Sequence, residues 1–124
     1  MNKNTKAAIS DVEMIENYGN RDKTTIGDKY IEKYPGNIPV IVEYNGVNFI
    51  VEPKNKKSQL LVPADTTLAY LVIIIRRSAK IVYSDNIVLY INGIRTTDSN
   101  TLSMVYPKYK NINDGCLHIT AVKE

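Results

Sequence analysis

The chain has 124 residues, 44% of them hydrophobic and 23% charged, a composition that is ordinary for one soluble domain with a single core. The net charge is only +3 and no basic stripe is visible, which argues against a nucleic-acid-binding domain. The longest apolar run, Leu68 to Ile75, is far shorter than the roughly 20 residues of a membrane-spanning helix. The polar start, Met1 to Thr5, does not resemble a secretory signal, and a single cysteine excludes an internal disulfide.

Two short helices are predicted in the N-terminal third. Ser10 to Glu13 has the spacing of a capping box and predicts a helix to about Tyr18. A second helix is expected from Thr25 to Lys33. Pro35 must end it, because proline disfavours helix in the residue that precedes it.

Strand signals follow. Ile38 to Tyr44 is rich in β-branched residues and predicts a strand. Asn45-Gly46 is a strong hairpin signal, so a return strand is expected over Val47 to Glu52. After a charged loop, Gln59 to Val62 predicts a short strand that Pro63 ends.

A helix is expected after Asp65, which is a good N-cap residue. Arg76 and Arg77 suit its C-terminal end, where the helix dipole favours cations. A buried strand remains the alternative, because Val72 to Ile75 is β-branched throughout. Four apolar residues would share one helix face: Leu68, Leu71, Val72 and Ile75.

The C-terminal part predicts a strand over Ile87 to Ile91, ending at Asn92-Gly93. A short helix is expected over Thr101 to Tyr106, and Pro107 should break or kink it. Leu117 to Ala121 is the last predicted strand. This order of elements indicates an α+β fold with one sheet covered by helices.

No catalytic constellation emerges from the residues. Cys116 and His118 are the only cysteine and the only histidine, and they lie two apart on a predicted strand. Their Cα atoms would then be about 6.5–7 Å apart, too far for a nucleophile–base hydrogen bond. Two such residues are too few for a zinc site, and the scattered glycines form no phosphate-binding loop. We therefore expect no enzyme activity, no cofactor and no metal.

Three segments carry a resemblance to a known family. They are Tyr34 to Glu43 (YPGNIPVIVE), Leu61 to Asp65 (LVPAD), and Leu102 to Tyr106 with Tyr109-Lys110 and Asp114-Gly115. In this order and at this spacing they resemble the autophagy-related ubiquitin-like modifiers, the GABARAP and light-chain family. The resemblance runs from about Thr24 to Glu124.

The resemblance implies a ubiquitin-like β-grasp fold with a four-stranded mixed sheet and two N-terminal helices. Residues 1–23 would form a divergent helical extension, and residues 24–124 the ubiquitin-like domain. It also implies docking of short peptides that carry an aromatic residue and, three positions on, an aliphatic one. Such a peptide would extend the sheet at an edge strand, here Gln59 to Val62.

The resemblance implies two pockets that bind the peptide's aromatic and aliphatic side chains. It also implies that Lys57 interacts with charged residues that flank the peptide motif. For Ile41, Leu61, Val62 and Leu71, plain core packing is the alternative. The aromatic pocket would be lined by Tyr30, Pro39, Ile41, Leu61 and Cys116. The aliphatic pocket would be lined by Leu60, Val62, Pro63, Thr66, Leu71 and Ile74.

Some residues depart from the family pattern. Cys116 stands where the family usually has an aromatic residue, so we expect a wider pocket. Asn37, Gln59 and Ser78 stand where arginine or lysine is usual, so acidic peptide flanks should help binding less. The chain ends at Glu124, before the C-terminal glycine through which family members are joined to phosphatidylethanolamine. The sequence as given is therefore not expected to be lipidated in that way.

The expected function is therefore that of an autophagy modifier in the cytoplasm, and on the autophagosome membrane when lipidated. Its partners would be peptide motifs of autophagy receptors and the activating and conjugating enzymes of the modifier pathway. Membrane contact would come only through lipidation, and no nucleic acid is expected. The alternatives are a sister modifier conjugated to a protein lysine, a non-conjugated ubiquitin-like adaptor and, last, a basic-surface role.

Overall fold

The computed structural model describes residues 24–124, and the helix expected from Ser10 to about Tyr18 lies outside them. Within this range three α-helices, one 3-10 helix and five strands follow one another. Their bounds are α1 Ile26–Lys33, β2 Asn37–Asn45, η1 Lys54–Lys56, β3 Lys57–Pro63, α2 Leu68–Ala79, β4 Ile87–Ile91, β5 Ile94–Arg95, α3 Leu102–Tyr109 and β6 Leu117–Lys123.

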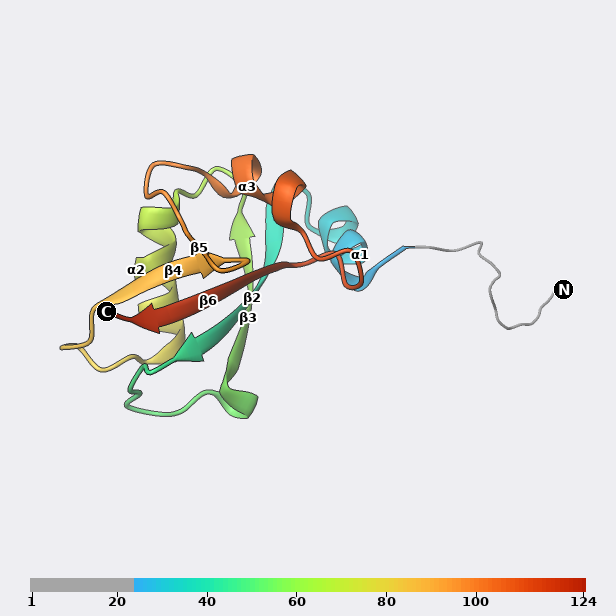
Figure 1. Cartoon of the computed structure of the whole chain (residues 1–124). Helices are drawn as coiled ribbons and strands as arrows, with labels where there is room; N and C mark the ends of the chain where they lie inside the picture. Colours follow the sequence, from blue (N-terminus) through green and yellow to red (C-terminus); the bar gives the residue numbers. More distant parts are fainter. Residues whose placement is uncertain (1–23) are drawn as a thin grey trace, which may run out of the picture.

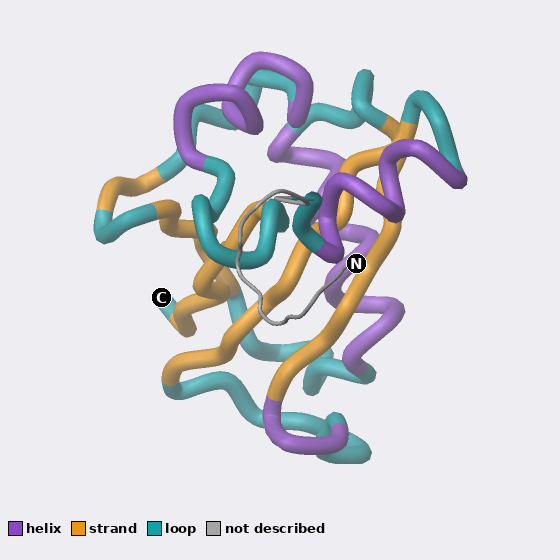
Figure 2. The backbone as a smooth tube through the Cα atoms, turned by 90° about the vertical axis from the view of Figure 1, so that its right-hand side faces the viewer, coloured by secondary structure: helices purple, strands orange, loops and turns teal. Residues whose placement is uncertain are grey.

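The strands form one mixed sheet in the order β3-β2-β6-β4-β5. β2 and β6 are parallel, whereas the other neighbouring strands are antiparallel. α1 and α2 lie on opposite faces of this sheet (Figure 1 and Figure 2). The predicted α+β class is confirmed, although the sheet has five strands where four were expected.

The additional strand is β5, which follows β4 through a tight hairpin. Asn92 and Gly93 have φ angles of 52° and 77°. Two successive positive φ values are typical of the type I′ turn, whose twist matches that of antiparallel strands. Ile94 and Arg95 therefore fold back and pair with the end of β4.

The strand predicted over Val47 to Glu52 is wrong, because Asn45-Gly46 does not form a hairpin. β2 pairs instead with β3, across a longer connection. The β-branched segment after Gly46 finds its hydrogen bonds elsewhere. Ile50 N–H donates to the Lys80 carbonyl at 2.8 Å, and Val82 N–H donates to the Asn48 carbonyl at 2.9 Å.

The apolar run after Thr67 is the helix α2, and the alternative of a buried strand is wrong. Leu68, Leu71 and Ile75 are fully buried, as the predicted helix face requires. The N-cap is Thr67 and not Asp65: the Thr67 hydroxyl accepts the Tyr70 N–H at 3.1 Å. Asp65 instead lies in a turn that ends before the helix begins.

Pro107 does not end α3, which continues to Tyr109. A proline inside a helix leaves the carbonyl four residues earlier without its partner. Here that residue is Ser103, and both it and Pro107 are exposed. The helix therefore loses one hydrogen bond on its solvent-facing side and persists for its last two residues.

The core fills the space between α2 and the sheet face that α2 covers. Along β3 burial alternates from residue to residue, whereas β2 has three successive buried residues, Ile38, Pro39 and Val40. The largest fully buried side chains come from β2, β3, α2, α3 and β6: Val40, Val42, Val62, Leu68, Leu71, Ile75, Leu102, Leu117 and Ile119.

Candidate functional site: an edge strand and its pocket

β3 is an edge strand. Its one neighbour in the sheet is β2, and the antiparallel register places Leu61 opposite Pro39 and Gln59 opposite Ile41. In an antiparallel edge strand, alternate backbone groups have no partner within the sheet. No strand of residues 24–124 covers this side of β3, so an added strand has free donors and acceptors there.

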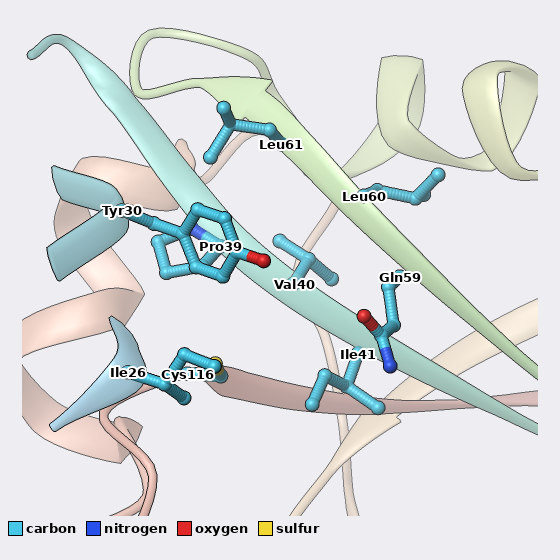
Figure 3. A pocket seen from close by; sticks show the side chains of 9 residues that line it. All are labelled: Ile26, Tyr30, Pro39, Val40, Ile41, Gln59, Leu60, Leu61 and Cys116. Carbon is cyan, nitrogen blue, oxygen red and sulfur yellow. The ribbon is translucent and has the colours of Figure 1, made fainter. Parts of the chain in front are cut away.

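Side chains on β3 alternate between the two faces of the sheet. Leu60 leaves the strand toward α2, whereas Leu61 points to the opposite face (Figure 3). Burial has the same alternation, since Val62 is 1% exposed and Leu61 is 38% exposed. The edge strand therefore presents one apolar side chain to each face next to its free backbone groups.

A pocket of about 240 Å³ lies beside this edge, between α1 and the strands β2 and β3 (Figure 3). An apolar cavity of roughly 150 Å³ already holds a benzene ring, so this pocket has room for one large aromatic side chain. Nine residues line it: Ile26, Tyr30, Pro39, Val40, Ile41, Gln59, Leu60, Leu61 and Cys116.

All five residues predicted for the aromatic pocket are among these nine. The sequence reasoning missed Ile26, Val40, Gln59 and Leu60 as lining residues. The period of α1 was a usable signal for Ile26, because residues four apart lie on one helix face with Tyr30. The alternation of β3 was the signal for Gln59, which shares a face with Leu61.

The pocket lining carries no formal charge. Its polar side-chain atoms are the Tyr30 hydroxyl, the Gln59 amide and the Cys116 thiol. Cys116 is 4% exposed. Burial raises the pKa of this thiol, and the nearby Asp114 charge raises it further. At neutral pH the cysteine is therefore a packed thiol and not a reactive thiolate.

A close contact between two glycines holds α1 over the pocket. Gly27 N–H donates to the Asp114 carbonyl at 2.8 Å, and a Cβ at Gly27 would overlap the Gly115 carbonyl group. Tyr106 of α3 stabilises the same turn, because its hydroxyl donates to the Gly115 carbonyl at 2.6 Å. The missing side chain at Gly27 thus sets how near α1, with Ile26 and Tyr30, approaches the sheet.

His118 is paired with Asp114 and not with Cys116. The His118 Nε2 atom lies 2.7 Å from Asp114 Oδ2, and Cys116 N–H donates to Asp114 Oδ1 at 2.9 Å. Burial pushes the pKa of Asp114 upward, but these two contacts outweigh it and hold that pKa below its usual value. The arrangement stabilises the turn before β6 and provides no nucleophile–base pair.

The residues predicted for the aliphatic pocket divide into two groups. Val62 and Leu71 are 1% and 0% exposed, so in this conformation they belong to the core. The other four keep solvent-accessible surface: Pro63 is exposed, and the remaining three are half-buried, namely Leu60, Thr66 and Ile74.

The predicted flank charge, Lys57, begins β3 and forms an ion pair with Glu43 at 3.3 Å. Both side chains are about half exposed, so solvent screens the pair strongly. The neighbouring negative charge of Glu43 lowers the positive potential that Lys57 offers to a peptide.

Residues 24–124 hold no group of three or more histidine, cysteine, aspartate or glutamate side chains placed to bind a metal ion. Over the same range, none of the helices is both long and apolar enough to span a bilayer.

Comparison with known proteins identifies relatives of this chain. The sequence model of the family described as "Autophagy protein Atg8 ubiquitin like" matches residues 21–124. Autophagy-related protein 8a of Arabidopsis thaliana is 34% identical over 89 residues, which cover 72% of this chain and 70% of that protein. Autophagy-related protein 8 of Schizosaccharomyces pombe is 34% identical over 98 residues, or 79% of this chain and 78% of that protein.

Two solved structures share the fold. The crystal structure of Trypanosoma brucei ATG8 superposes with a TM-score of 0.66 at 28% identity, covering 79% of this chain and 82% of that one. Plasmodium falciparum Atg8, solved in complex with a Plasmodium falciparum Atg3 peptide, superposes with a TM-score of 0.62 at 25% identity. That match covers 77% of this chain and 83% of the Plasmodium chain.

Proposed function

Because this chain belongs to the Atg8 family of ubiquitin-like autophagy proteins, we propose that it docks short peptides with an aromatic-x-x-aliphatic pattern on β3. The observation that carries the proposal is the uncovered edge of β3 with an uncharged pocket directly beside it. The protein works as an adaptor through this surface and not as an enzyme.

The peptide binds as an added strand. Its backbone bonds to the free N–H and C=O groups of β3, which fixes its direction and register. The aromatic side chain enters the pocket between α1 and the sheet, where it contacts Tyr30, Ile41 and Leu61. Desolvation of this ring by apolar walls supplies most of the affinity.

The aliphatic side chain, three positions on, lies on the α2 side of the edge, because side chains along a strand alternate between faces. Leu60 points to that side, Ile74 of α2 is partly accessible, and Pro63 ends the strand beside them. Val62 and Leu71 are buried in the core next to these residues, and their packing holds Leu60 and Ile74 in place. Lys57 contributes little, since Glu43 is already its partner.

Partners of this kind are the peptide motifs of autophagy receptors and of the conjugating machinery. The Atg3 peptide bound to Plasmodium falciparum Atg8 supports the second group. Residues 24–124 form the ubiquitin-like domain in this proposal, and residues 1–23 a separate N-terminal extension.

In the cell we place the protein in the cytoplasm, and on the autophagosome membrane once joined to phosphatidylethanolamine through a glycine beyond Glu124. Conjugation to a protein lysine and a non-conjugated adaptor remain the competing forms. The mass of the protein isolated from cells distinguishes all three, because a lipid, a second protein and no attached group give different masses.

Calorimetric titration of the chain with an aromatic-x-x-aliphatic peptide tests the proposal. Saturable binding in the micromolar range is expected, and it should vanish when the peptide's aromatic residue is replaced by alanine. Leu61→Arg should also abolish binding, because it puts a charge at the pocket mouth. Leu61 is partly exposed, so this variant should remain folded.

Ile94→Arg is the matched control. Ile94 is an exposed apolar residue on β5, the opposite edge of the sheet. The Ile94→Arg variant should therefore bind the peptide as the parent chain does. Absence of binding at millimolar peptide, or equal losses in the two variants, would refute docking on β3.

A further inference from the structure

Two connections and the C-terminal residues meet at one end of the sheet. The parallel strands β2 and β6 both end there, and their antiparallel neighbours β3 and β4 both begin there. Glu124 N–H donates to the Asn86 carbonyl at 2.9 Å, which joins the end of the chain to the connection before β4. We call this end the C-terminal pole; it comprises residues 46–56, 80–86 and 123–124 (Figure 1).

The C-terminal pole is held together by polar contacts. Asp85, which is 4% exposed, accepts the Asn48 backbone N–H at 2.8 Å and lies 3.5 Å from Lys123 Nζ. The Arg76 guanidinium donates to the carbonyls of Asp85 and Tyr83 at 2.6 and 2.9 Å. These contacts, with the bonds between residues 48–50 and 80–82, fix both connections relative to the sheet.

Large apolar side chains project from these fixed connections. Tyr83 is 88% exposed, Ile50 73% and Val51 66%. Among the residues that the structure describes, only Ile112, at the opposite pole, is an equally exposed large apolar residue. Scattered exposed apolar residues need no explanation, but three of the four most exposed ones share this small region.

The same pole carries four lysines, Lys54, Lys56, Lys80 and Lys123, against three carboxylate side chains, Glu52, Asp85 and Glu124, a formal excess of one positive charge. Each of its carboxylates has a cationic partner: Glu52 pairs with Lys56, Asp85 with Lys123 and Glu124 with Arg95. Lys54 and Lys80 have no ion-pair partner among the described residues, and neither has Arg77 in the last turn of α2.

We propose that the C-terminal pole binds an anionic phospholipid surface. Ile50, Val51 and Tyr83 enter the headgroup region, where apolar and tyrosine side chains are stable. Lys54 and Lys80 remain at headgroup level and attract the anionic lipids. Single exposed apolar side chains on a pole with two unpaired lysines suit a fluid charged surface better than a folded protein partner.

The direction of β6 agrees with this occupant, because the strand runs into the same pole, where Glu124 N–H bonds to the Asn86 carbonyl. A lipid joined beyond that residue would hold the C-terminal pole against the bilayer, a consequence that rests on the proposed function. Binding by the unconjugated chain does not rest on it, so the test uses the chain without lipid.

The chain has no tryptophan, which allows single-tryptophan reporters in the full chain. Tyr83→Trp and the control Ile112→Trp replace equally exposed residues at opposite poles. Vesicles of phosphatidylcholine and phosphatidylserine in equal parts should shift the emission of Tyr83→Trp to shorter wavelength. They should leave the emission of Ile112→Trp unchanged. The basic residues of segment 1–23 are the same in both reporters, so their contribution cancels.

In the Tyr83→Trp background, Lys80→Asn should weaken partition about fivefold, the factor expected for one basic residue near an anionic membrane. Asparagine tolerates the left-handed backbone of Lys80, so the fold is preserved. Adding Leu61→Arg should leave the emission shift intact, which separates this test from that of peptide docking.

No shift of Tyr83→Trp, or equal shifts of both reporters, would overturn the proposal. So would a shift without vesicles that grows with protein concentration, since it would identify a second copy as the occupant.

Discussion

Gly27→Ala is expected to loosen α1, the helix that forms one wall of the pocket beside β3. The added Cβ would overlap the Gly115 carbonyl group and lie 2.9 Å from the Asp114 carbonyl oxygen. All these atoms are backbone, so no flexible side chain can move aside. The clash is relieved only if α1 moves away from the Gly115 turn, and this movement stretches the 2.8 Å hydrogen bond between Gly27 N–H and the Asp114 carbonyl.

The stability cost follows from three effects. Overpacking at a rigid contact costs about 1–3 kcal/mol. The backbone hydrogen bond contributes about 1 kcal/mol. Alanine is better than glycine within a helix by about 1 kcal/mol, which offsets the lost bond. The free energy of unfolding should therefore fall by about 2 kcal/mol, within the spread of the overpacking cost.

The affinity cost follows from the position of Ile26 and Tyr30 on the same helix. In the proposed docking mode, withdrawal of α1 removes the contact between Tyr30 and the peptide's aromatic ring. Such a contact contributes about 0.5–1.5 kcal/mol, so Kd should rise about two- to twelvefold.

Urea unfolding and calorimetric peptide titration measure the two costs separately. Gly46→Ala serves as the control, because Gly46 also has a positive φ angle of 73° but lies outside the pocket. The control should lose stability while keeping its affinity. If Gly27→Ala matched the parent chain in both assays, the close approach of α1 to Gly115 would be refuted.

Further outcomes follow from single side chains. Gln59→Lys should strengthen the binding of peptides with acidic flanks and make that binding salt-dependent, because the pocket wall is otherwise uncharged. Titration at two salt concentrations measures the effect, and an equal gain for neutral peptides would contradict it. The Asn48 backbone N–H holds the pKa of Asp85 below its ordinary value of 3.8, so the carboxylate stabilises the fold above that pH and loses its effect as pH falls further. Asp85→Asn should thus lower the melting temperature at pH 7, by an amount that shrinks below pH 3.8; a pH-independent difference would refute this assignment. Because its pKa is raised, the Cys116 thiol should react with iodoacetamide more slowly than free cysteine at the same pH, and bound peptide should slow it further; alkylation followed by mass spectrometry checks both.

The sequence alone was enough for elements whose signals lie within a short window. The helical spacing of Leu68, Leu71 and Ile75 predicted α2, and Pro35 marked the end of α1. The ordered motifs from Tyr34 to Gly115 predicted the ubiquitin-like fold. They also brought together the five residues that line the aromatic pocket with others.

Features that depend on distant partners could not be predicted in this way. Val47 to Glu52 has strand-like residues, yet its partner is the connection after α2 and not β2. Asn45-Gly46 and Asn92-Gly93 look alike in the sequence, but only the second has a positive φ angle at both residues. Whether such a dipeptide closes a hairpin depends on the segment that follows it. Ile94 and Arg95 pair with β4, whereas the residues after Gly46 bond to the connection after α2.

The amino-acid pattern of this chain determined the three helices, most of the strands and which residue types face the pocket, because backbone preference and side-chain periodicity are local properties. The tertiary structure decided the distance between α1 and the Gly115 turn, the pairing of Lys57 with Glu43, and the meeting of Ile50, Val51 and Tyr83 at one pole. Those features arise from contacts between residues far apart along the chain, and they exist only after the sheet has set the strands side by side.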